Sequence, residues 1–383
     1  MTTPSPGDVR ALCARALDGG ILELAELEAL LAIDDERLAG EVFSAAREAR
    51  ERHFCDGVFL YGFVYFSTYC RNDCAFCYYR ADNALSPRYR KTMAEVVAIC
   101  EGLASSGVDL LDLTMGEDPL IHGDPGYLAL LELVGAVRAA TGLSVMVSPG
   151  VVPESALRDL RASGADWYAL YQETHTPELY ARLRVGQAFA ERVITRRAAR
   201  AAGLLVEDGM LTGIGDTAAD RARSVAAMRE AGWPQVRVMT FVPQEGTPLA
   251  DVRPAGDLAE LLTIAVLRLV LPDRLIPASL DVDGIRGLER RLAAGANVVT
   301  SIVPPTSGLA GVSNAVLDID EGYRTVAGVL PHLKRLGLRP AGTAAYLETL
   351  ERLRVAGAAP LPGGAAAPAP SRAAAVGSQA PPP

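Results

Sequence analysis

Long apolar runs are absent from this sequence of 383 residues, although half of its residues are hydrophobic. No stretch approaches the ~18 apolar residues that a membrane-spanning helix needs. The first residues also lack the basic segment followed by an apolar segment that marks a secretory signal. We therefore expect a soluble, cytoplasmic protein that does not bind a membrane and that can bury a large core.

Basic residues are outnumbered, because 37 lysine and arginine residues stand against 46 aspartate and glutamate residues and give a net charge of −9. Lysine occurs only at Lys91 and Lys334. The sequence has no basic stripe with interleaved aromatic residues, which is the pattern expected of a nucleic-acid surface. We therefore exclude nucleic acid as a partner.

Cysteine and histidine are also few, with six and four residues. Six cysteines in so long a chain do not make a disulfide framework. Cys13, Cys55 and Cys100 are isolated and are expected to be ordinary small apolar residues. None of the histidines forms a ligand-spaced cluster with the other three cysteines, which argues against a zinc site. The histidines are His53, His122, His175 and His332.

The other three cysteines, Cys70, Cys74 and Cys77, have the spacing C-x3-C-x2-C. Cysteine thiolates hold [4Fe–4S] clusters, and most such clusters use four of them. A loop that supplies three cysteines leaves one iron without a protein ligand. This iron can bind a substrate or cofactor, as the open position on a catalytic zinc ion does. Three buried structural cysteines, or a zinc site completed by a histidine, are the alternatives; ligand type and spacing favour the cluster.

This spacing, with an aromatic residue just before the last cysteine, resembles the radical S-adenosylmethionine (SAM) superfamily. The resemblance implies that the amine and carboxylate of SAM chelate the open iron. It also implies that one electron from the cluster cleaves SAM to a 5′-deoxyadenosyl radical. In that superfamily the backbone of this region contacts the adenine, so Phe76 and Tyr78 are candidate SAM contacts.

Strand-like and helix-like stretches alternate along most of the chain. Residues 1–54 repeat apolar residues at helical intervals, which predicts an N-terminal helical extension. Eight strand–helix units follow, and such alternation predicts an α/β fold with a parallel sheet, here a (β/α)8 TIM-type barrel over residues 55–345. A partial six-unit barrel is the alternative. The strands are expected at 58–66, 108–115, 143–148, 166–172, 204–211, 235–242, 275–281 and 297–303.

Two further features concern single segments. Asp124-Pro125 has the cap and the first-turn proline of a helix start, so we expect a helix to begin there. Residues 356–383 consist mainly of Ala, Pro, Gly and Ser with almost no charge, which predicts a disordered tail.

Reacting groups in such barrels lie at the carboxyl ends of the strands. The second strand ends in Gly116-Glu117-Asp118, where a glycine permits close approach of the backbone to a ligand. This stretch resembles the glycine–glutamate segment that binds the SAM amino group in the superfamily. Glu117 is therefore a candidate SAM ligand, and a tight turn with solvated acids is the alternative.

The end of the fourth strand and the helix after it supply three more candidates. Gln172 and Glu173 stand where biotin synthase and the hydrogenase maturase, which belong to the superfamily, carry polar groups for the SAM ribose and amine. Arg192 stands where those relatives place an arginine against the SAM carboxylate, and its planar fork suits a carboxylate. An ordinary surface residue on a helix is the alternative for Arg192.

Four polar residues lie within predicted strands and are expected to face the barrel interior. Arg237 alternates with Met239 in the sixth strand, and an arginine inside a barrel is costly unless it is paired with an anion. Asp112, Ser279 and Asp281 are the other three. Such a cavity complements a small diamino acid such as lysine, and an internal Arg–Asp ion pair without a ligand is the alternative.

Longer stretches resemble the methylornithine synthases of pyrrolysine biosynthesis, from about residue 50 to about residue 345. They are 61–70, 112–119, 183–187, 236–248 and 276–281. The resemblance implies a lysine mutase that converts L-lysine to (3R)-3-methyl-D-ornithine, the first step of that pathway. It implies Arg237 on the substrate carboxylate and Asp112, Ser279 and Asp281 on its amines.

The same resemblance implies a [4Fe–4S] cluster, SAM, and an electron donor such as flavodoxin or ferredoxin. Another radical SAM reaction of the biotin synthase or hydrogenase-maturase type is the alternative enzyme. An iron–sulfur electron carrier is the alternative outside enzymes, but it needs a fourth cluster ligand, and no fourth cysteine is suitably placed.

Overall fold

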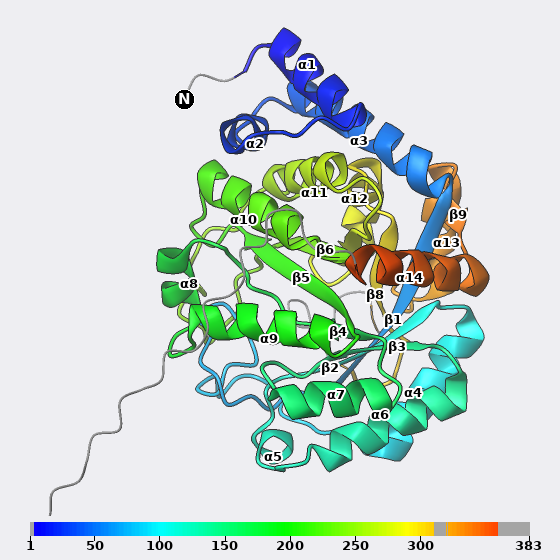
Figure 1. The fold of residues 1–383 in the computed structure, drawn as a ribbon. Coiled ribbons are helices and arrows are strands. Elements are labelled where there is room, and N and C mark those ends of the chain that lie inside the picture. The colour runs from blue at the N-terminus through cyan, green and yellow to red at the C-terminus, as the bar shows by residue number, and fades with distance from the viewer. Residues whose placement is uncertain (1–3, 310–318, 320, 359–383) are drawn as a thin grey trace, which may run out of the picture.

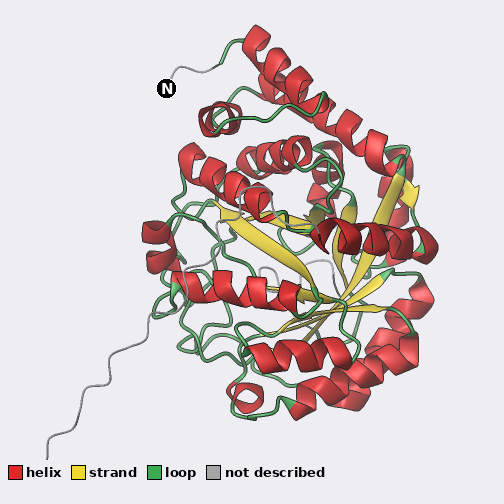
Figure 2. Cartoon of the chain, in the orientation of Figure 1, coloured by secondary structure: helices red, strands yellow, loops and turns green. Residues whose placement is uncertain are grey.

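The computed structural model describes residues 4–309, residue 319 and residues 321–358 (Figure 1). Its centre is a ring of parallel strands with helices outside, as Figure 2 shows. The ring strands are β1 (Gly57–Ser67), β2 (Leu110–Met115), β3 (Ser144–Ser148), β4 (Trp167–Ala169), β5 (Leu205–Thr212), β6 (Gln235–Thr240), β7 (Pro277–Ser279) and β8 (Val298–Ile302).

The strands pair in the order β6-β5-β4-β3-β2-β1-β8-β7. A single parallel bridge between Gln235 and Leu275 joins the two ends of this sheet, and the Val236 amide donates to the Leu275 carbonyl oxygen at 3.1 Å. The barrel is therefore nearly closed, with its weakest seam between β6 and β7. The prediction of an eight-unit TIM-type barrel is confirmed, and the six-unit alternative is wrong.

Helices follow the strands and shield the outer face of the barrel. The longer ones are α4 (Met93–Ser106), α6 (Leu128–Thr141), α7 (Glu154–Ala162), α9 (Phe189–Ala201), α10 (Ala218–Ala231), α11 (Leu258–Val270) and α13 (Val326–Arg335). The shorter ones are α5 (Pro119–His122), α8 (Pro177–Leu183), the 3-10 helix η1 (Gly284–Gly287) and α12 (Leu288–Ala293). None of the described helices is long and apolar enough to cross a membrane.

The structure corrects the prediction that a helix begins at Asp124-Pro125, because α6 begins at Leu128. The cap-and-proline pattern operates one step earlier, where Asp118 caps α5 and Pro119 is its first residue. Asp124 instead accepts hydrogen bonds from the amides of Gly126 and Leu128, at 3.1 and 2.6 Å, and so forms a turn before α6. Both aspartate–proline pairs fit a helix start, and only the structure distinguishes between them.

Three helices precede the barrel, α1 (Pro6–Leu17), α2 (Leu24–Leu31) and α3 (Glu36–Phe54). They lie against α10 and α11 on the outside of the barrel, far from α6 and α7 in Figure 1. Their buried apolar residues, among them Val9, Leu27 and Val42, join the core formed by the strands and the barrel helices. The boundaries of a helical extension, a barrel domain and a tail remain a prediction.

A final segment, which the sequence did not predict, covers the amino-terminal end of the barrel. β9 (Arg339–Pro340) pairs with the start of β1, and α14 (Thr343–Ala358) follows. The Tyr346 hydroxyl accepts a hydrogen bond from the Trp167 indole at 3.0 Å, and its ring packs against Phe59. A ligand must therefore enter from the carboxyl ends of the strands. The rest of the predicted tail lies outside the described residues.

Candidate active site

The three cysteines lie on the loop that follows β1, and all three line one pocket at the carboxyl ends of the strands. Its volume is about 150 Å³. The loop arrives there because β1 ends at Ser67 and turns, with Ser67 donating to the buried carboxylate of Asp118. The pocket is also lined by the predicted residues Phe76, Glu117, Glu173 and Arg192.

Gly116 makes room for the cysteine loop itself. A Cβ at this position would lie 2.3 Å from the Tyr69 carbonyl oxygen and 2.9 Å from the Cys70 Cβ. The glycine was expected to permit close approach of the backbone to a ligand; it lines the cysteine pocket, and its missing Cβ leaves the space that the cysteine loop occupies. The next residue of this segment, Glu117, is fixed to the same loop: its carbonyl oxygen accepts from the Arg71 amide at 2.9 Å.

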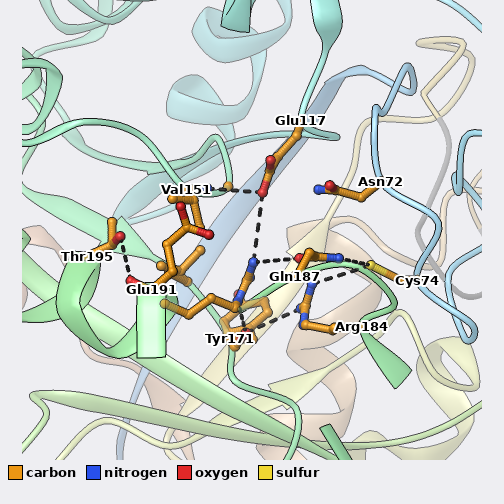
Figure 3. Close-up of polar contacts among 12 residues, drawn as sticks. Asn72, Cys74, Glu117, Val151, Tyr171, Arg184, Gln187, Glu191 and Thr195 are labelled. Atoms are coloured by element: carbon orange, nitrogen blue, oxygen red, sulfur yellow. Dashed lines mark hydrogen bonds and ion pairs between the residues drawn. The ribbon is translucent and has the colours of Figure 1, made fainter. Parts of the chain in front are cut away.

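Two residues of the 183–187 stretch contact the cysteines and were not proposed as site residues. Gln187 donates its side-chain amide to the Cys74 Sγ at 3.0 Å, and Arg184 donates to the same sulfur at 3.6 Å (Figure 3). The Arg184 guanidinium also lies 5.3 Å from the centre of the Phe76 ring. The only signal in the sequence was the family resemblance of this stretch, which gave no role to either side chain.

Glu117 is a buried carboxylate with several donors around it. It accepts from the Val151 amide at 3.1 Å and from the Arg71 Nε at 3.0 Å, and the Arg192 guanidinium lies 3.8 Å away. Burial opposes ionisation, but the Val151 hydrogen bond and the charge of Arg192 outweigh it and hold the pKa of Glu117 below its usual value. Glu117 therefore presents a negative charge to the pocket, and a solvated turn does not describe it.

Glu173 projects into the pocket from a strained backbone. Its φ is +67°, which costs about 1–3 kcal/mol in a residue with a side chain. Hydrogen bonds to β5 hold it there, since its amide donates to the Gly209 carbonyl oxygen and its carbonyl oxygen accepts from the Leu211 amide. Its carboxylate forms a buried ion pair with Arg184. The result is a Glu173–Arg184–Cys74 chain of contacts along one side of the pocket.

Arg192 is buried, so a surface role on α9 does not describe it. Its Nε donates to the Tyr171 carbonyl oxygen at 2.9 Å, and one Nη contacts the Gln187 side-chain oxygen at 3.4 Å. Burial, and then the nearby charge of Arg184, lower its pKa to about 10, so it stays cationic near neutral pH. It bridges the Glu117 and Tyr171 sides of the pocket.

Two of the predicted cofactor contacts do not line this pocket. The Gln172 side chain faces the helix layer, where it donates to the Phe189 carbonyl oxygen at 3.2 Å and accepts from Arg196 at 2.8 Å. The Tyr78 hydroxyl donates to the Leu85 carbonyl oxygen at 3.0 Å on the outer side of the cysteine loop. The structure thus corrects the placement of Gln172 and Tyr78 beside the other candidates.

Below the pocket, the predicted interior arginine has an anionic partner that the sequence analysis missed. Arg237 on β6 pairs with Glu207 on β5, with Nε and Oε1 2.8 Å apart and both side chains buried. The Tyr171 hydroxyl donates to the same carboxylate at 2.9 Å, and Arg237 reaches Thr300 on β8 at 3.3 Å. The signal was present, because an acid inside a buried strand needs a partner.

Asp112 on β2 lies close enough to this pair to be affected by it. Burial raises the pKa of Asp112 to about 7; the positive charge of Arg237 lowers it and the negative charge of Glu207 raises it. It accepts a hydrogen bond from the Thr114 hydroxyl at 2.9 Å, and Thr114 lines the cysteine pocket. Asp112 and Arg237 are therefore brought together, as predicted, beneath the cofactor pocket.

Ser279 is the last residue of β7, Asp281 follows two residues later, and both are buried. Asp281 forms an ion pair of 2.9 Å with Arg324, a residue that the sequence analysis did not single out. Ser279 accepts from the Asp281 amide at 3.2 Å, and its strand neighbour in register is Thr300, which contacts Arg237. The four predicted interior residues thus belong to adjacent parts of one barrel interior.

The residues present fit an iron–sulfur cluster. Burial and the charges of neighbouring cysteines raise the pKa of the Cys70 and Cys77 thiols, so a metal cluster would be needed to balance the thiolate forms of these two residues. Within the described ranges, no three His, Cys, Asp or Glu side chains surround a single ion. In a cubane each cysteine binds a different iron, whereas zinc needs its ligands convergent.

Comparisons with known proteins agree with this geometry. Residues 64–228 match the model of the radical SAM superfamily. The chain is 46% identical to the 3-methylornithine synthase of Methanosarcina barkeri over 87% of this chain and 94% of that protein. It is 30% identical to the [FeFe] hydrogenase maturase subunit HydE of Thermotoga maritima over 71% of this chain and 78% of that protein.

A solved structure gives the same result for the fold. The crystal structure of methylornithine synthase (PylB) superposes with a TM-score of 0.84 at 45% identity, over 88% of this chain and 99% of the other. The biotin synthase of Trichlorobacter lovleyi is more distant, at 28% identity over 71% of this chain and 81% of that protein. The chain is a radical SAM enzyme that belongs to the 3-methylornithine synthase family.

Proposed function

We propose that this protein is a lysine mutase that converts L-lysine to (3R)-3-methyl-D-ornithine, the first step of pyrrolysine biosynthesis. The single observation that carries the proposal from the structure is the charge of the barrel interior beneath the cysteine pocket. It buries two guanidiniums, Arg237 and Arg324, and three carboxylates, Glu207, Asp112 and Asp281. With Asp112 ionised this set carries one net negative charge, which complements the single net positive charge of lysine.

The roles of the interior residues follow from their partners. Arg237 already pairs with Glu207 through Nε and Nη2, and among the described residues its Nη1 contacts only the neutral Thr300 hydroxyl. A substrate carboxylate is a stronger acceptor than a hydroxyl, so Arg237 is the group that would hold it. Asp112 and Asp281 would hold the two amines, and Ser279 would donate or accept beside Asp281.

The upper pocket would hold the cofactors. Cys70, Cys74 and Cys77 would hold the [4Fe–4S] cluster, and the bound cluster and SAM supply radical chemistry that removes a hydrogen atom from the substrate. The ionised Glu117 would hold the SAM amine. Glu173, Arg192 and Phe76 are the other proposed SAM contacts, and all three line the same pocket.

A carbon-skeleton rearrangement requires that both substrate fragments stay in place until they recombine. Water must also be kept from the reactive species. The covering of the amino-terminal end by α14, with Tyr346 hydrogen-bonded to Trp167, supports this requirement. The ring of Tyr171 adds to it, because this side chain lies between the cysteine pocket and the Arg237–Glu207 pair.

The test is the variant Arg237→Ala, assayed with L-lysine and SAM under anaerobic conditions. The variant should bind SAM normally and form no methylornithine. Normal turnover would remove Arg237 from the proposal. A lysine-dependent SAM cleavage assay on the unaltered enzyme separates this function from a reaction of the biotin synthase or maturase type, which need not recognise lysine. A cytoplasmic location and an electron donor such as flavodoxin or ferredoxin are further parts of the proposal.

A further inference from the structure

A second cavity lies outside the barrel, between α9 and α10, and plays no part in the proposed reaction. Its volume is about 310 Å³, twice that of the cysteine pocket. The residues that matter for its chemistry are four arginines and one histidine that line it, Arg196, Arg197, Arg200, Arg223 and His175. Glu230 is the one carboxylate in the lining. This concentration of positive charge stands out in a chain whose net charge is −9.

Two polar atoms of the lining are buried and have no hydrogen-bond partner among the described residues. They are the Nδ1 of His175 and the Nε of Arg196, whose side chains are 8% and 2% exposed. The His175 Nε2 and the Arg196 Nη1 lie 3.2 and 3.3 Å from the Asp208 carboxylate. A buried polar group without a partner is costly, so these atoms call for a ligand or ordered water in the cavity.

Two guanidiniums of the lining have no carboxylate to neutralise them in the part of the chain that the structure describes. Arg197 makes no ion pair there, and Arg200 donates only to the carbonyl oxygens of Ala231 and Gly232, at 2.6 and 3.1 Å. Arg200 is also stacked on the Trp233 ring, 4.2 Å from its centre. Burial, and then the charges of Arg274 and Arg197, lower the pKa of Arg200.

We propose that this cavity binds a small phosphate-bearing metabolite through Arg196, Arg197, Arg200 and His175. A phosphate group carries two negative charges near neutral pH, which matches the two guanidiniums without carboxylates, and its oxygens suit the planar arginine fork. The apolar part of the lining, Phe189, Val193 and Ala227, would contact the carbon skeleton of the metabolite.

The site lies directly behind residues 170–173, three of which line the cysteine pocket. Arg196 donates to the Gln172 side chain at 2.8 Å and to the Leu170 carbonyl oxygen at 2.9 Å. Glu173, which follows Gln172 in the chain, lines the cysteine pocket. A bound anion that engages Arg196 changes the field at this segment, so it should change the affinity for SAM. The two affinities must then change by the same factor, because coupling between sites is reciprocal.

The test uses the cluster-loaded enzyme with inorganic phosphate and with glycerol phosphate, at constant ionic strength. Phosphate binding should raise the unfolding temperature and shift the ring signal of His175 alone among the four histidines. Tighter binding of the ester than of free phosphate would assign the apolar wall to an organic ligand. The proposal would be overturned if phosphate raised the unfolding temperature no more than chloride does at the same ionic strength. It would also be overturned if the ring signals of several histidines shifted as much as that of His175.

Two variants and one matched control make the test specific. Arg197→Gln should weaken phosphate binding roughly tenfold, which corresponds to about 1.4 kcal/mol of binding free energy. Ala227→Glu should abolish binding, because it places a carboxylate inside the cavity. Arg37→Gln changes an exposed arginine of α3 and should bind phosphate as the unaltered enzyme does. Undiminished binding in both cavity variants would contradict the site, and SAM affinity that phosphate leaves unchanged would contradict the coupling.

Discussion

Glu207 and Arg237 form an ion pair of 2.8 Å in the barrel interior, where both side chains are almost inaccessible to solvent. The pair explains how an arginine can remain charged inside the nearly closed barrel before any substrate binds. It also limits what Arg237 can offer a ligand, because its Nε is already taken. Substrate recognition would therefore depend on the Nη side of the guanidinium and on the groups around it.

Breaking this pair should be costly. Glu207→Gln leaves Arg237 buried without a counter-charge, and we expect the free energy of unfolding to fall by about 3–5 kcal/mol. If Arg237 faces the substrate carboxylate, added L-lysine should restore more stability to this variant than it adds to the unaltered enzyme. Denaturant unfolding with and without lysine measures both effects.

Glu154→Gln is the matched control, because Glu154 pairs with Arg158 on the surface of α7 and both side chains are more than half exposed. Its loss should change stability by less than about 1 kcal/mol. A Glu207→Gln protein as stable as this control would show that the interior pair contributes little.

Gly116→Ala should impair assembly of the cluster. The added Cβ would meet the Tyr69 carbonyl oxygen at 2.3 Å, and because this is backbone it cannot move without shifting the cysteine loop. We expect loss of most bound iron and of the cluster absorbance after anaerobic reconstitution. Gly102→Ala in α4, where a Cβ meets nothing within 4 Å, should retain both. Full cluster content in Gly116→Ala would contradict the tight packing described here.

Glu117→Gln should weaken SAM binding ten- to a hundredfold, the effect of losing one hydrogen bond to an ionised group, about 1.5–3 kcal/mol. Iron content should not change, since the glutamine keeps the shape of the side chain. Tyr78→Phe is the comparison, because its hydroxyl bonds Leu85 outside the pocket. Calorimetric titration with SAM measures both variants, and a larger loss in Tyr78→Phe than in Glu117→Gln would reverse their assignment.

Lysine binding should depend on pH through Asp112, whose pKa burial raises to about 7. Below that pH the carboxyl group is neutral and cannot balance an ammonium group, so affinity should fall by up to about tenfold per pH unit. The sign for stability is the opposite of that for an ordinary ion-paired acid. Since the folded protein holds the Asp112 proton more tightly than the unfolded chain, the free energy of unfolding falls as pH rises from about 4 to about 7. Asp112→Asn should remove both trends, and an unchanged pH profile in this variant would assign them to another group.

Most of the fold was predictable because strand and helix signals are local. The eight strands were located from apolar and β-branched runs, and each is found within a few residues of its predicted bounds. The failures are long-range or degenerate. No pattern in the sequence of residues 343–358 predicts that they cover the amino-terminal end of the barrel. Asp118-Pro119 and Asp124-Pro125 carry the same start signal for a helix.

The candidate site was predictable where a motif or strand alternation supplied the position. The cysteine motif places Cys70 in the site, and strand alternation points Asp112 and Arg237 into the barrel. Neither signal identifies the partner of a side chain. Arg237 was expected to require an anion, and the missed partner, Glu207, lies in the neighbouring strand. Gln172 precedes Glu173 directly, yet its side chain points to the opposite side of the barrel wall, which a residue-by-residue analogy cannot reveal.

The most direct measurement is incubation of the anaerobically reconstituted protein with SAM, dithionite and L-lysine, followed by chromatographic separation of lysine isomers and mass spectrometry. Mass alone cannot decide, because the product of a mutase has the mass of lysine. We expect a new isomer that co-elutes with methylornithine and is absent with Arg237→Ala. Deoxyadenosine without any new isomer would retain the radical SAM chemistry and contradict lysine as the substrate that this barrel rearranges.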